Sequence, residues 1–152
     1  VGVTPVLDMF KKGISVGLGT DGYTADMTES YKVMNIISKH EKRLPSVGWL
    51  ESPQMIFNNN PMIANKFMKN GKVGVLKKGY YADIIIVDYK APTPLNENNI
   101  NGHLLFGISG RNVDTTIING KIVMDERILT CIDEEKITSK SVELAKKVWS
   151  RI

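Results

Sequence analysis

A short apolar run, residues 14–18, lies between Gly13 and Gly19. A run of this length bounded by glycines predicts a short buried β-strand. Thr20 and Asp21 then lie where the strand passes into a loop, which is where parallel α/β folds gather ligand-handling side chains. A carboxylate held there can ligate a metal or move a proton, so Asp21 is the candidate functional residue. The alternative is an aspartate that only hydrogen-bonds within its own turn.

Apolar residues recur at helical spacing in four other places in the first half of the chain. Asp26 followed by Glu29 resembles a capping arrangement and starts the longest of these helices. Ser52 and Asn60 each precede a proline, and this pairing predicts an N-cap and the first residue of a helix. The predicted helices cover about residues 5–12, 26–42, 53–57 and 61–69.

The pattern changes after Gly71, where nearly continuous apolar stretches predict strands. Residues 92–101 are rich in proline and asparagine and predict a long polar connection. Asn119-Gly120 separates two apolar runs and predicts a hairpin with a type I′ turn. The predicted strands cover residues 73–76, 81–88, 115–118 and 121–124, and a last amphipathic helix covers about 133–149. The chain therefore changes from alternating helix and strand to mostly strand.

Composition narrows the class of protein. With 152 residues, 42% of them hydrophobic and 24% charged, the chain has room for one ordinary globular domain or for parts of two. No apolar run approaches the ~18 residues of a membrane helix, so we expect no membrane partner. The net charge of +4 is modest and the lysines are spread out, so we expect no nucleic-acid partner. Cys131 is the only cysteine; its apolar neighbours predict a buried thiol, and a cytoplasmic location is expected.

The chain holds only two histidines, and neither has the spacing of a metal ligand. His40 falls in the charged last turn of the predicted helix 26–42 and is expected at the surface. His103 precedes three apolar residues and is expected to be structural; the alternative is that it faces a partner strand or a subunit boundary.

Four motifs follow one another over residues 13–125. They are Gly19-Thr20-Asp21-Gly22; Asn60-Pro61 with Ala64; Val73-Gly74-Val75-Leu76 with Gly79 and Ala82-Asp83-Ile84-Ile85-Ile86-Val87-Asp88; and Val113–Ile118 with Asn119-Gly120-Lys121 and Val123. In this order they resemble the metal-dependent amidohydrolases. The most similar branch contains chlorohydrolases and cytosine, guanine and adenosine deaminases, together with an aminohydrolase associated with selenium metabolism.

This resemblance implies an α/β fold in which a metallo-dependent (β/α)8 barrel is joined to a small composite β-sandwich built from both chain ends. Residues 1–70 would be the last barrel units, and residues 71–127 the C-terminal strands of the sandwich. Residues 128–152 would form a terminal strand and helix that pack back on the body. Because a complete barrel needs about 250 residues, the chain is expected to be a C-terminal fragment whose partner is the missing N-terminal part of its own chain.

The resemblance also implies a chemistry, the hydrolysis of a non-peptide C–N or C–halogen bond by a metal-activated water. The expected reaction is deamination of a small cyclic or amidine-like substrate, and the expected metal is one divalent ion, zinc or iron. Asp21 matches the family's barrel-strand aspartate, whose implied roles are metal ligand and proton shuttle.

The sequence also departs from the family, because the histidine ligands and the glutamate acid/base have no counterpart in it. The fragment alone is therefore expected neither to retain the metal nor to turn over substrate, whereas the intact protein is expected to be an active homodimer. The alternative is a non-catalytic remnant that acts as a partner-binding or oligomerisation module.

Overall fold

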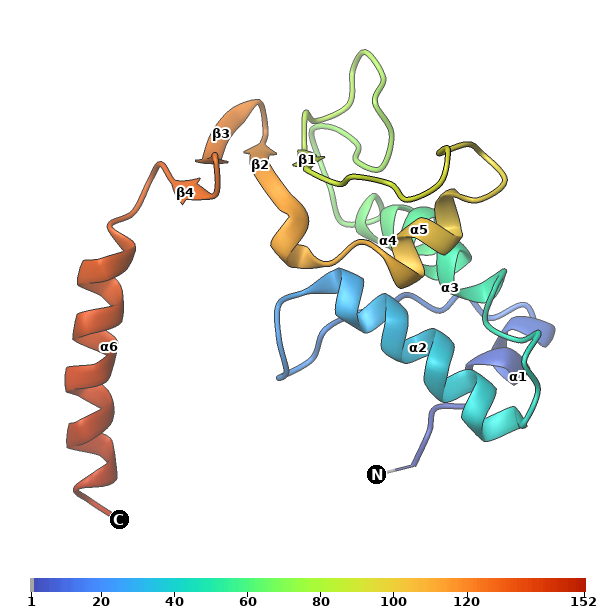
Figure 1. The fold of residues 1–152 in the computed structure, drawn as a ribbon, viewed down its shortest axis with the longest axis horizontal. Helices are drawn as coiled ribbons and strands as arrows, with labels where there is room; N and C mark the ends of the chain where they lie inside the picture. The colour runs from blue at the N-terminus through green and yellow to red at the C-terminus, as the bar shows by residue number, and fades with distance from the viewer. Residues whose placement is uncertain (1) are drawn as a thin grey trace.

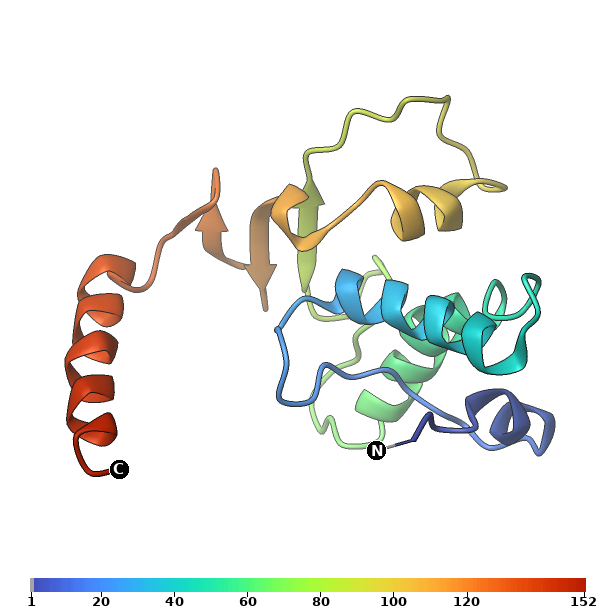
Figure 2. The same ribbon diagram turned by 60° about the horizontal axis from the view of Figure 1, so that its bottom comes forward.

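The computed structural model describes residues 2–152 as a group of helices beside a small antiparallel sheet, with one long helix standing apart (Figures 1 and 2). The helices are α1 (Val6–Lys11), α2 (Met27–Lys42), α3 (Glu51–Pro53), the π-helix η1 (Gln54–Asn59), α4 (Asn60–Ala64), α5 (Ile100–Phe106), the 3-10 helix η2 (Gly110–Asn112) and α6 (Glu134–Trp149). The strands are β1 (Ile84–Val87), β2 (Val113–Ile118), β3 (Lys121–Asp125) and β4 (Ile128–Leu129).

Helix α2 is the centre of the helical part and begins where the sequence predicts. The Asp26 side chain caps it by accepting the backbone N–H groups of Thr28 and Glu29. Its inner face carries Tyr31 and Met34, which are buried in the core. The other buried apolar residues come from α1, from η1, and from α5 with the segment after it: Leu7, Met55, Leu105 and Ile108. The core therefore lies where these helices meet α2.

The two separate helices predicted at 53–57 and 61–69 are wrong, because α3, η1 and α4 follow one another without a break from Glu51 to Ala64. Neither predicted cap acts as a cap. Ser52, which is 0% exposed, donates its hydroxyl to the sulfur of Met34 at 2.8 Å. Asn60 has helical φ and ψ angles and uses its side chain elsewhere. Both side chains that were predicted to cap the start of a helix therefore bind distant parts of the chain instead.

The sheet has the strand order β1-β2-β3-β4, with every neighbouring pair antiparallel. The hairpin between β2 and β3 is confirmed, and its turn residues Asn119 and Gly120 have φ angles of 50° and 75°. The Asp83 carboxylate accepts the Asn119 N–H at 2.7 Å and so joins the turn to the start of β1. The predicted strand 81–88 is reduced to β1.

The strands predicted at 14–18 and 73–76 are wrong. Among the described residues neither segment belongs to a β-ladder, and residues 74–75 form a bend in which Gly74 has a φ angle of 107°. Residues 16–18 are only half-buried, so the expected buried core strand is absent as well. A strand needs a neighbouring backbone to satisfy its polar groups. Here the side-chain amides of Asn59 and Asn60 in the helix 51–64, and of Asn65 at its C-cap, satisfy several of them instead.

The polar connection predicted at 92–101 leads into helix α5, which begins at Ile100 and was not predicted. His103 in this helix is buried, and both of its ring nitrogens are hydrogen-bonded, Nδ1 to the Tyr89 hydroxyl at 2.9 Å and Nε2 to Thr93 Oγ1 at 3.2 Å. His103 is therefore structural, as predicted. His40 is exposed, also as predicted, whereas Cys131 is exposed and the prediction of a buried thiol is wrong.

Helix α6 follows β4 and lies away from the other helices in both views (Figures 1 and 2). It buries none of its residues in this chain, so the packing of residues 128–152 against the rest of the protein stays a prediction. None of the helices in the described part of the chain has the length and apolar character needed to cross a membrane.

Candidate functional site

Asp21 comes three residues after Leu18, the last residue of the segment 14–18, and is exposed. Its φ angle of 54° lies in the left-handed region, which an aspartate enters more readily than most residues. One carboxylate oxygen, Oδ1, accepts the N–H of Gly22 at 2.7 Å. The local hydrogen bond of the alternative interpretation is therefore present, but it engages one oxygen and is compatible with a ligand role for the other.

Asp21 lines a cavity of about 610 Å³ between the N-terminal segment, the extended segment 16–21 and helix α2. Half of the α2 residues that line this cavity are apolar, and among them is Val33, which is 51% exposed. The loop after Asp21 also contributes Tyr23 and Thr24. The candidate carboxylate therefore lies at a concave surface of the size that small ligands occupy.

A small hydrogen-bond network holds the loop between Asp21 and α2. The Thr24 hydroxyl donates to Glu29 Oε2 at 2.5 Å, and the Asp26 N–H donates to Thr24 Oγ1 at 3.4 Å. Asp26 Oδ1 also accepts the Thr28 hydroxyl at 2.6 Å. Although burial alone would raise it, the pKa of Asp26 is held below its ordinary value by hydrogen bonds from Thr28, Gly110 and Glu29. The charged form of Asp26 is thus the form that caps α2 and binds Gly110.

The described residues supply few metal ligands. Asp21 and Glu29 are the two carboxylates at the cavity, and residues 2–152 contain no group of three His, Cys, Asp or Glu side chains that could hold a metal. A zinc site usually has three or four protein ligands. His103 has both ring nitrogens engaged at α5, so it is not one of them. Asp21 fits a metal site as one oxygen ligand, and the described chain alone does not complete such a site.

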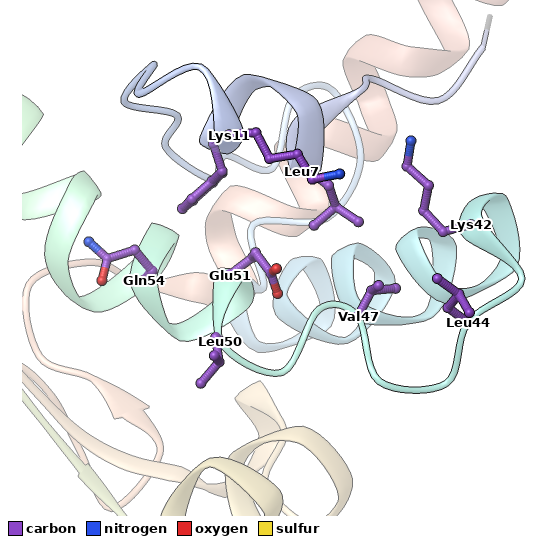
Figure 3. Close-up of a pocket in the computed structure, with 9 residues that line it drawn as sticks. Leu7, Lys11, Lys42, Leu44, Val47, Leu50, Glu51 and Gln54 are labelled. Atoms are coloured by element: carbon purple, nitrogen blue, oxygen red, sulfur yellow. The ribbon is translucent and has the colours of Figure 1, made fainter.

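A second cavity of about 380 Å³ lies between α1, the end of α2 and the start of the helix 51–64 (Figure 3). Apolar side chains such as Leu7 and Val47 line it, together with Lys11, Lys42 and Glu51. Lys42 forms an ion pair with Asp8 at 3.1 Å, and this hydrogen bond lowers the pKa of Asp8. These contacts tie α1 to α2 and bring no further catalytic group to Asp21.

The residues that sequence reasoning missed are Asn59 and Asn60. Their side chains bind the backbone of the segment that leads to Asp21. The Asn-Pro pair at 60–61 was interpreted as a helix cap, and no local pattern distinguishes a capping asparagine from one that binds a distant backbone.

Comparison with known proteins connects this arrangement to a family of hydrolases. The sequence profile of the amidohydrolase family matches residues 1–123. A 5-methylthioadenosine/S-adenosylhomocysteine deaminase from Dictyoglomus thermophilum is 36% identical over 96% of this chain and 35% of its own length. A 5′-deoxyadenosine deaminase from Methanosarcina barkeri is 30% identical over 99% of this chain and 35% of its own. The chain thus spans about one third of the length of the curated relatives it matches.

Two solved structures share the fold. A zinc-bound adenosine deaminase from Xanthomonas campestris superimposes on 98% of this chain and 34% of its own, with a TM-score of 0.81 at 16% identity. A zinc complex of atrazine chlorohydrolase from Arthrobacter aurescens covers 94% of this chain and 32% of its own, with a TM-score of 0.70 at 18% identity. At these identities the likeness concerns the fold, a mixed α/β arrangement found in metallo-dependent hydrolases.

Proposed function

This chain belongs to the amidohydrolase family, and from that premise we propose that it is part of a metal-dependent aminohydrolase. The proposed substrate is a small-molecule adenosine derivative altered at its 5′ position, and the reaction replaces the ring amino group by oxygen with release of ammonia. This substrate class is supported by the deaminases that are 30% and 36% identical to nearly the whole chain. The atrazine chlorohydrolase is similar in fold only, so dehalogenation has less support.

Asp21 is proposed as a metal ligand and as the group that carries the water's proton towards the leaving amino group. The observation behind this role is its place: an exposed carboxylate beside a cavity, at the end of an extended segment, with Oδ1 bound to its own turn. The Gly22 N–H restrains the carboxylate and leaves Oδ2 available for the metal or for a proton.

The metal itself is proposed to be zinc or iron. When bound, such an ion lowers the pKa of a coordinated water so that hydroxide is available near neutral pH. Zinc is supported by the zinc-bound structures of the same fold. Because the described residues provide one suitable ligand at this place, the proposal requires histidine ligands from outside residues 2–152.

The rest of the protein is proposed to complete both parts of the fold. Residues 1–70 would close a barrel with units outside this chain, and residues 71–127 would join further strands in a composite sandwich. Strand β1 supports this arrangement, because it lies at the edge of the sheet and its Ile85 and Ile86 are more than half exposed. Exposed apolar residues on α2, such as Ile36, are likewise available for packing. A homodimer of the intact protein remains part of the proposal.

The test is Asp21→Asn in the whole protein, assayed for ammonia release from 5′-methylthioadenosine, S-adenosylhomocysteine and 5′-deoxyadenosine. We expect kcat/KM to fall by about 10²–10⁴-fold, the range for loss of a positioned acid or base. Asp8→Asn is the matched control, because Asp8 lies on α1 and pairs with Lys42. Full activity of Asp21→Asn would remove Asp21 from the mechanism. A whole wild-type protein that binds neither zinc nor iron, and that stays inactive on all of these nucleosides when either metal is added, would favour the non-catalytic alternative.

A further inference from the structure

The segment that leads to Asp21 is held by two consecutive asparagine side chains. Asn60 Oδ1 accepts the N–H of Leu18 at 2.8 Å, and Asn60 Nδ2 donates to the carbonyl of the same residue at 2.8 Å. Asn59 Nδ2 donates to the carbonyl of Val16 at 2.7 Å. An amide that binds both backbone groups of one residue makes the contacts that a neighbouring β-strand would make. Asn60 therefore substitutes for a strand partner at Leu18.

The π-helix η1 explains how neighbouring side chains reach the same segment. η1 ends at Asn59 and α4 begins at Asn60, so the pair lies where the wider π turn returns to an α-helix. π turns of this kind occur frequently at functional sites. Gln54 Nε2 donates to Asn59 Oδ1 at 3.1 Å, which turns the Asn59 amide so that its nitrogen faces Val16. The helix thus presents two oriented amides to one extended stretch.

The close approach also depends on Gly17, the residue between the two that are held. A Cβ at Gly17 would lie 2.6 Å from Asn60 Oδ1, which is shorter than any ordinary contact. Glycine at position 17 therefore leaves the space that the Asn60 side chain occupies.

Asn65, the C-cap of α4, makes an equivalent contact that has no relation to Asp21. Asn65 Oδ1 accepts the N–H of Val73 at 2.9 Å, and Asn65 Nδ2 donates to the carbonyl of Val73 at 3.1 Å. Both asparagines are partly buried, and both bind a single residue through its two backbone groups. Asn65 is therefore a control that reproduces the chemistry of Asn60 at a different place.

We propose that Asn60, supported by Asn59, is a positioning residue for Asp21: it fixes Leu18, three residues earlier, and so directs the Asp21 carboxylate towards the metal. This inference rests on the proposed function, in which Asp21 is a metal ligand. Residues that hold a ligand in place typically change metal affinity by about 10–100-fold when they are replaced.

The experiment compares Asn60→Asp with Asn65→Asp in the whole, zinc-loaded protein, and measures zinc affinity by competition with a chelating dye. In each variant the aspartate still accepts the backbone N–H, but its second oxygen replaces a donor that faces a carbonyl oxygen. We expect Asn60→Asp to weaken zinc binding by about tenfold or more and Asn65→Asp to leave it within about twofold, the change expected without a link to the metal. Equal effects of the two substitutions, or an unchanged zinc affinity in Asn60→Asp, would overturn the proposal.

A double variant separates positioning from general destabilisation. If Asn60 acts through Asp21, then Asn60→Asp adds no further loss of zinc affinity when Asp21→Asn is already present. Additive losses would mean that Asn60 acts independently of Asp21, and the proposal would be wrong. If Asp21→Asn alone leaves both zinc affinity and activity intact, the proposed role of Asp21 at the metal fails and the positioning role fails with it, whereas a whole protein without activity on the nucleosides would reject the proposed function. If Asp21→Asn abolishes them and only Asn60→Asp has no effect, the proposed function stands and the positioning role alone is rejected.

Discussion

Asp26 and Gly110 are 84 residues apart in the sequence, yet Asp26 Oδ2 accepts the Gly110 N–H at 3.0 Å. The other oxygen of the same carboxylate caps helix α2. One side chain therefore joins the helix beside the candidate site to η2, the short helix that precedes the β2–β3 hairpin. Three of the following predictions concern this connection.

Asp26→Ala should destabilise both parts that Asp26 joins. Loss of a helix cap costs about 1 kcal/mol, and loss of a further hydrogen bond to a charged acceptor about 1.5 kcal/mol or more. Hydrogen exchange read by mass spectrometry should show faster exchange in the first turns of α2 and also around Gly110. Asp133→Ala is the matched control, because Asp133 caps α6, which buries none of its residues. The control should affect α6 only, and an effect of Asp26→Ala confined to α2 would contradict the connection.

The Asp26 carboxylate should also make the stability of the protein depend on pH. The pKa of Asp26 in the folded protein is lowered from 3.8, so the folded state favours the charged form. The contribution of Asp26 to the free energy of unfolding is fully present above its ordinary pKa of 3.8. This contribution is lost as the pH falls through the lower, folded-state pKa. Asp26→Asn does not titrate, so its urea midpoint should lie below that of the wild type at about pH 7 and approach it at about pH 3.

Asp8 and Glu143 also have lowered pKa values, and they will make both proteins less stable in acid. The comparison therefore uses the difference between the two midpoints at each pH, which isolates Asp26. If the difference between the two urea midpoints grew as the pH fell, the charged form of Asp26 would not be the stabilising form, and the prediction would be wrong.

Gly110→Ala should be destabilising, because the added Cβ would lie 2.7 Å from Asp26 Oδ2 and 2.8 Å from its Cγ. Forcing a methyl group into such a contact costs about 1–3 kcal/mol. Gly102→Ala is the control, since a Cβ there meets no atom within 4 Å and lies within α5. A double-mutant cycle with Asp26→Ala, which makes room for the methyl group, should show non-additive effects on the free energy of unfolding. Additive effects of the two substitutions would show that the methyl group of Gly110→Ala does not clash with Asp26.

His103→Ala should reduce stability without changing metal content in the whole protein. The substitution leaves the hydroxyls of Tyr89 and Thr93 without their partner, which costs about 1–3 kcal/mol for each group that stays buried. His40→Ala at the exposed end of α2 should change the free energy of unfolding by less than about 0.5 kcal/mol. Loss of bound metal in a folded His103→Ala protein would show that His103 has a role at the site that its contacts do not suggest.

Local signals were sufficient for some elements of the fold and insufficient for others. Asp26 and Asn119-Gly120 determine a helix start and a turn through contacts within a few residues, and both predictions are confirmed. The segments 14–18 and 73–76 have the composition of strands, but a strand also requires a partner, and their partners here are the side chains of Asn60 and Asn65. The predicted caps failed for the same reason, because Ser52 and Asn60 bind distant atoms.

The candidate site shows the same division. The position of Asp21 after an apolar run and the membership of the chain in the amidohydrolase family followed from the order of short motifs. The catalytic role of Asp21 stays a prediction. The amides that hold its segment were beyond sequence reasoning, because they depend on a π turn and on contacts across more than 40 residues.

The way Asn60 holds Leu18 also bears on where the chain can change length. Two paired strands can slip past each other in steps of two residues without turning their side chains over, whereas an amide on a helix selects a single residue. The spacing from Leu18 to Asp21 is therefore constant as long as Asn60 keeps its partner. Within the segment that leads to Asp21, length changes that preserve the site are therefore expected before Val16, and a single added residue between Leu18 and Asp21 would move the carboxylate away from its place.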